Sequence, residues 1–107
     1  MAEKIRAIVK RPDEKYGHVT NISNTLKNFQ RIVEGTIEVI YATEDTAIVC
    51  NDEGKLRGLE ENFFIHNDLI TDLIVGEVAI VGVDGEDFCD CPLELSDWKE
   101  LLKKWGN

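Results

Sequence analysis

Apolar and polar residues alternate near the start of the chain, which is the pattern of a β-strand with one buried face. In residues 4–10, Ile5, Ala7 and Val9 are apolar, and most of the residues between them are basic. We therefore predict a strand there with one apolar face and one basic face. An exposed edge of this strand would permit dimerisation by extension of the sheet.

A second alternating segment covers residues 36–42. It places Ile37, Val39 and Tyr41 on one face and Glu38 on the other, so we predict a strand that buries its apolar face.

Residues 47–50 are apolar on both faces, as in interior strands, and they follow closely enough to form a hairpin with residues 36–42. Residues 60–72 show no clear period, so we expect a loop with at most one helical turn. Further strands are predicted at residues 18–22, 55–59 and 77–83.

Two segments have helical periodicity. The first lies between Asn24, a favourable N-cap, and Gly35, which suits the left-handed position after a helix, and it predicts a helix over about residues 25–34. The second begins at Ser96 or Asp97 as the cap. Its apolar stripe consists of Trp98, Leu101, Leu102 and Trp105. Together these elements predict one α+β domain over residues 1–107, with a mixed or antiparallel sheet of about 4–5 strands and two helices packed on it.

Composition narrows the function classes. The net charge is −9, from 12 basic and 21 acidic residues. Such a charge disfavours direct binding to nucleic acid or to an anionic membrane surface. No apolar run reaches the ~18 residues of a membrane-spanning helix, and the first residues lack a signal-peptide layout. We therefore expect a cytoplasmic protein.

The charge is unevenly distributed, with +4 on residues 1–33 and −13 on residues 34–107. We expect the acidic part to form one face that binds the basic surface of a partner protein. The candidate partner-binding residues are Asp52, Glu53, Glu60, Glu61, Glu86, Asp87 and Asp90.

Two alternatives remain open. Arg6, Lys10, Arg11 and Asn62 are candidates for holding a nucleotide-like anion, which would make the protein a sequestering protein for a small ligand. The carboxylates of residues 84–90 are candidates for a divalent metal in an enzyme.

No motif indicates catalysis or a cofactor. Cys50, Cys89 and Cys91 are expected to be free thiols, because their spacing does not match that of a structural zinc site, although a zinc ion shared with His18 or His66 stays an alternative. Neither histidine lies near a nucleophile in sequence.

Three segments of the chain carry a resemblance to a known family. They are residues 35–40, residues 50–56 with Gly58, Leu59 and Asn62, and residues 75–77 with Gly82 and residues 84–88. In this order and spacing they resemble the small bacterial and phage proteins that share domain of unknown function 3846. The resemblance covers most of the chain and implies a phage, plasmid or mobile-element setting in bacteria, with no established reaction. Glu60 and Glu61 depart from the proline-containing segment often found before Asn62 in that family.

The leading hypothesis is therefore a non-enzymatic interaction protein of phage or mobile-element origin. Its acidic face would engage a host protein, such as a nucleic-acid-binding enzyme, by mimicking the phosphate backbone in counter-defence.

Overall fold

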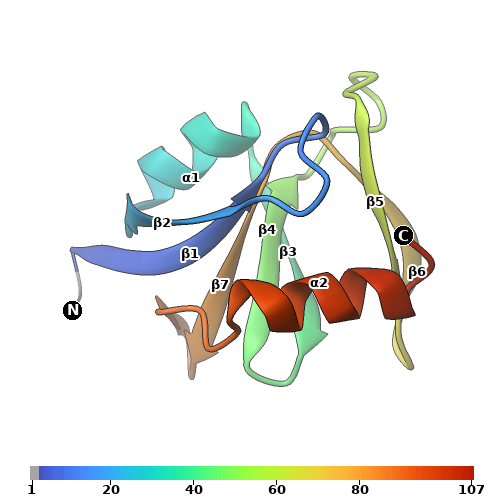
Figure 1. The fold of residues 1–107 in the computed structure, drawn as a ribbon. Coiled ribbons are helices and arrows are strands. Elements are labelled where there is room, and N and C mark those ends of the chain that lie inside the picture. The colour runs from blue at the N-terminus through green and yellow to red at the C-terminus, as the bar shows by residue number, and fades with distance from the viewer. Residues whose placement is uncertain (1–2) are drawn as a thin grey trace.

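The computed structural model describes residues 3–107, which form two helices and eight strands (Figure 1). The elements in chain order are β1 (Lys4–Lys10), β2 (His18–Ser23), α1 (Leu26–Val33), β3 (Ile37–Thr43), β4 (Thr46–Asn51), β5 (Glu61–His66), β6 (Thr71–Val75), β7 (Val78–Asp84), β8 (Asp87–Cys89) and α2 (Leu95–Lys104).

Six strands form one antiparallel sheet in the order β2-β1-β7-β4-β3, with β8 paired to β7. β1 pairs with the first half of β7 and β8 with its last residues, while β4 lies on the other side of β7. β8 therefore continues the line of β1 beside β7. The α+β class is confirmed, and the sheet is larger than the sequence predicts because the acidic segment after β7 also pairs as a strand.

β1 is an interior strand and not an edge, since it pairs with β2 on one side and β7 on the other. Its predicted apolar face is confirmed, because Ile5, Ala7 and Val9 pack in one core cluster with Phe29 and Val33 of α1. The expectation that its edge is exposed for dimerisation is wrong. The strand order of this sheet ends in β2 on one side and in β3 on the other.

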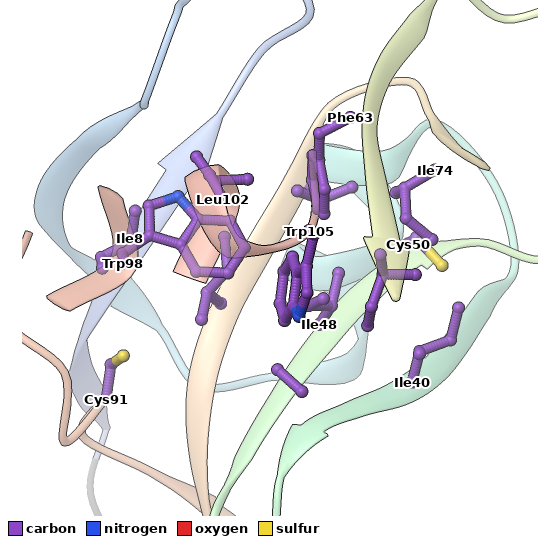
Figure 2. Close-up of a cluster of buried hydrophobic side chains, with 14 residues drawn as sticks. Ile8, Ile40, Ile48, Cys50, Phe63, Ile74, Cys91, Trp98, Leu102 and Trp105 are labelled. Atoms are coloured by element: carbon purple, nitrogen blue, oxygen red, sulfur yellow. The ribbon is translucent and has the colours of Figure 1, made fainter. Parts of the chain in front are cut away.

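The opposite face of the sheet is covered by α2 and by the β5–β6 hairpin (Figure 1). The predicted stripe of α2 is confirmed, since Trp98, Leu102 and Trp105 are buried. Figure 2 shows this cluster, in which Phe63 of β5 lies beside both tryptophans, with ring centroids 5.4 Å from Trp98 and 6.4 Å from Trp105. A partly buried Leu101 packs against the cluster.

The predicted loop at residues 60–72 is wrong, because residues 61–66 and 71–75 pair as an antiparallel hairpin. A register shift between Glu61 and Phe63 interrupts the alternation of buried and exposed residues. Phe64 then points outward directly after the buried Phe63. The predicted strand at residues 55–59 is also wrong, since that segment consists of turns.

The helix ends differ from the predicted ones by one or two residues. Thr25 caps α1 by accepting a hydrogen bond from the Asn28 amide (3.2 Å), whereas Asn24 donates to the Phe88 carbonyl. The left-handed residue after α1 is Glu34, with φ 64°. α2 is capped by Glu94, whose backbone N–H donates to Asp97.

No helix in the described part of the chain has the length and apolar character needed to cross a membrane.

Candidate functional site

A cavity of about 280 Å³ lies where the ends of β3 and β4 face β6 and the turn that follows β4. β4 is completely buried, and its alternation directs Cys50 to the same side as Ile40 of β3. Ile74 and Val75 of β6 complete an apolar floor. Figure 2 shows Ile40, Cys50 and Ile74 together at one end of the core cluster.

Four carboxylates line this cavity, from Glu38, Asp52, Glu53 and Asp72. Within residues 3–107, Lys55 is the one basic residue of the lining, and its ammonium is paired with the Asp72 carboxylate. The lining therefore carries a surplus of negative charge over an apolar floor. This combination suits the end of a lysine or arginine side chain, whose stem is apolar and whose head is cationic.

The Cys50 thiol stays protonated in this setting. Burial raises its pKa to about 12, and the nearby carboxylate of Glu38 acts in the same direction. The thiol donates to the Glu38 carbonyl oxygen (3.7 Å) and lies 3.9 Å from its Oε1. Because only the thiolate is a good nucleophile, Cys50 forms part of the floor and is not set up for nucleophilic attack.

We expect Cys50 to control part of the alkaline loss of stability. The unfolded chain releases this proton near the ordinary pKa of 9.0, and the folded chain holds it to about 12. The unfolded state binds fewer protons in that interval, so the free energy of unfolding falls as the pH rises. Between about pH 8 and about pH 10, the unmodified protein should lose about 1.4 kcal/mol more than Cys50→Ala. Urea unfolding at each pH measures this difference, and parallel profiles for the two proteins would contradict it.

The structure divides the predicted acidic residues between the two ends of the sheet. Asp52 and Glu53 line the cavity. Glu60 and Glu61 lie at the same end, where the Glu60 carbonyl accepts a hydrogen bond from the Gly76 amide just before β7.

Glu86, Asp87 and Asp90 lie at the opposite end, because Asp84 pairs with Asp87 across the turn that ends β7. Asp90 is engaged within the fold, since its Oδ1 accepts a hydrogen bond from the Arg6 backbone N–H (2.7 Å). The seven residues therefore form two groups separated by the length of β7, and Asp52 and Glu53 of the first group line the cavity.

The candidate anion-binding residues are also divided. Lys10 and Asn62 touch, since the Lys10 ammonium donates to Asn62 Oδ1 (2.5 Å) and to the Glu14 carbonyl (2.7 Å). Lys10 is 2% exposed, and burial lowers its pKa against the opposing effect of nearby carboxylates. Its ammonium is used to join β1 to β5.

Arg6 and Arg11 form contacts with other residues and do not join the pair of Lys10 and Asn62. The Arg6 guanidinium donates to the carbonyls of Cys91 and Leu93 (both 2.8 Å), and so ties the segment before α2 to β1. Arg11 is exposed and pairs with Asp13 (3.4 Å).

The three cysteines are free thiols, as predicted. Cys50 and Cys91 lie at opposite ends of the core cluster (Figure 2). The structure therefore does not bring the three cysteines together as ligands of the one zinc ion considered from the sequence. In the part of the chain that the structure describes, no group of three or more His, Cys, Asp or Glu side chains is arranged to hold a metal ion. This includes the carboxylates of residues 84–90.

Sequence reasoning missed Glu38 and Asp72 as site residues. The apolar face predicted for β3 is wrong. Ile40 and Ala42, on the same face as Glu38, are buried, whereas Val39 and Tyr41 are 38% and 45% exposed. The sequence signal for Glu38 was its spacing from Ile40, because residues two apart in a strand lie on the same face. Asp72 lies in the segment predicted to be a loop.

The comparisons with known proteins give one match. A family model described as Domain of unknown function (DUF3846) matches residues 5–105, nearly the whole chain. No curated protein and no solved structure matches the chain.

Proposed function

The chain belongs to the family described as Domain of unknown function (DUF3846), and we propose that it is a non-enzymatic interaction protein that binds a basic partner protein at its acidic cavity. A lysine or arginine side chain of the partner would lie on the apolar floor with its cationic head among the carboxylates. The observation that carries this proposal is the cavity itself, with four carboxylates and one lysine in its lining.

The size of the cavity favours a side chain over a free cofactor. Its volume of about 280 Å³ lies just below the ~300–1,000 Å³ of typical small-molecule sites. Apolar contact along the stem of a lysine or arginine supplements the charge interaction at its head.

The charge of the whole chain supports a basic partner. A net charge of −9 accelerates encounter with a positively charged surface and repels anionic ones. An enzyme whose basic channel accepts nucleic-acid phosphates has the required surface. In the bacterial phage or mobile-element setting implied by the family resemblance, the protein would occupy such a channel of a cytoplasmic host enzyme and act in counter-defence.

The test is a calorimetric titration with an oligo-arginine peptide as a defined basic probe. We expect binding at low salt that is lost at about 0.5 M salt, where the Debye length falls to about 5 Å. The double variant Glu38→Gln with Asp52→Asn should weaken binding about tenfold, because it removes two of the four carboxylates of the cavity.

A charge-matched control separates the cavity from the net charge. The double variant Glu86→Gln with Asp87→Asn removes the same charge from the opposite end of β7. It should change the affinity less than about twofold. Equal weakening by both double variants, or no binding of the probe at low salt, would overturn the proposal.

A further inference from the structure

We propose that the partner contributes an extended segment that pairs with the open edge of β3, so that one of its basic side chains enters the acidic cavity while its neighbours contact an apolar patch. This inference rests on the proposed function and adds the conformation and sequence pattern of the ligand. It describes recognition by addition of a strand, in which the main chain supplies affinity and pockets for alternate side chains supply specificity.

The edge of β3 is open. Within the described residues, β3 pairs with β4 and with no strand on its other side. The Thr36 carbonyl accepts from the Asp52 amide on the β4 side (2.9 Å). Antiparallel alternation then directs the backbone groups of Glu38 and Ile40 toward β4, and those of Ile37 and Val39 toward solvent.

The usual protections of a sheet edge are absent along most of β3. Its sequence, Ile37–Thr43, contains neither lysine nor proline, the residues that commonly blunt such edges. A register shift is confined to its end, between Tyr41 and Thr43. There the Asn67 side chain donates to the Tyr41 carbonyl (3.3 Å), so the accessible stretch is the first part of the strand.

The two faces of this edge differ in chemistry. On the face shared with α1, Val39 and Tyr41 remain 38% and 45% exposed, which leaves an apolar patch. On the other face, Glu38 borders the cavity. Because side chains of an added strand alternate between the faces, the fitting segment alternates apolar and basic residues.

Charge favours a basic segment over a second copy of this chain. Two antiparallel β3 strands would bring their Glu38 carboxylates together at the edge, beside cavities that each carry Asp52, Glu53 and Asp72. Like charges placed opposite each other destabilise a strand pair, whereas a lysine opposite Glu38 stabilises it.

The experiment uses a short blocked peptide of alternating lysine and valine, titrated into the full chain. We expect its affinity to fall about tenfold when alternate backbone amides of the peptide are N-methylated, since that change keeps the charge and removes the pairing groups. Unchanged affinity of the N-methylated peptide would overturn the inference without the need for any protein variant.

A variant of the protein gives an independent arm. Val39→Pro removes an amide that points away from β4, so the β3–β4 ladder keeps its hydrogen bonds while the edge loses a donor. We expect Val39→Pro to weaken the peptide about tenfold, and the matched Val39→Ala to weaken it less than about threefold.

The outcomes separate this inference from the proposed function. Loss of binding with the Glu38→Gln and Asp52→Asn double variant, but not with Val39→Pro or N-methylation, would leave the cavity as a basic-side-chain site and overturn strand addition. Indifference to all three changes would overturn both. Self-association of the protein alone in sedimentation, abolished by Val39→Pro, would assign the edge to a second copy and also overturn this inference.

Discussion

Replacing Trp98 by alanine is expected to lower the free energy of unfolding by about 4 kcal/mol. Trp98 is fully buried, with its ring centroid 5.4 Å from that of Phe63 and 5.7 Å from that of Trp105. Its indole N–H donates to the Tyr16 carbonyl (2.9 Å). The substitution therefore leaves a cavity at the junction of α2, β5 and the segment after β1.

The loss would be a large part of the ~5–15 kcal/mol that stabilises a typical domain. Urea unfolding followed by far-ultraviolet circular dichroism measures it without depending on tryptophan fluorescence. Trp98→Phe is the matched control, since it keeps an aromatic ring and removes the hydrogen bond, and it should cost about half as much. A loss below about 1 kcal/mol for Trp98→Ala would show that the two layers do not depend on this contact.

Replacing Asn62 by alanine is expected to cost about 3 kcal/mol. Its Oδ1 accepts from the Lys10 ammonium (2.5 Å), and its amide nitrogen donates to the carbonyls of Lys10 (3.0 Å) and Gly76 (2.7 Å). These bonds join the β5–β6 hairpin to the main sheet. The variant leaves the buried ammonium of Lys10 with one acceptor fewer, and an under-solvated buried charge is costly.

Two comparisons test this interpretation of Asn62 by the same unfolding measurement. Asn21→Ala changes an exposed asparagine on β2 and should cost less than about 0.5 kcal/mol. Adding Lys10→Met to Asn62→Ala should recover part of the loss, because the uncompensated charge is removed. Additive losses in the double variant would contradict the assigned role of the ammonium.

The acidic site shows where reasoning from sequence ends. Asp52 and Glu53 were among the predicted binding residues because charge is visible in the sequence, and both line the cavity. Glu38 and Asp72 were not, because they come from strands that are distant along the chain and meet only when β6 lies over β3 and β4. Likewise, nothing local distinguishes Glu86 from Glu53, although they lie at opposite ends of the sheet.

The local hydrophobic pattern by itself determined the helices, the hairpin of β3 with β4, the buried β7 and the α+β class. Burial on one face imposes a repeat on neighbouring residues, as in the helices, and burial on both faces gives a continuous apolar run, as in β4 and β7. The pattern failed at β5, where a shift in register breaks the alternation between Glu61 and Phe63. The tertiary structure alone decided that β1 is interior, that β3 has a free edge, and that carboxylates from three separate segments surround Cys50. These features depend on which strands pair across long separations in sequence, as β1 and β4 do with β7, and no local pattern encodes such pairing.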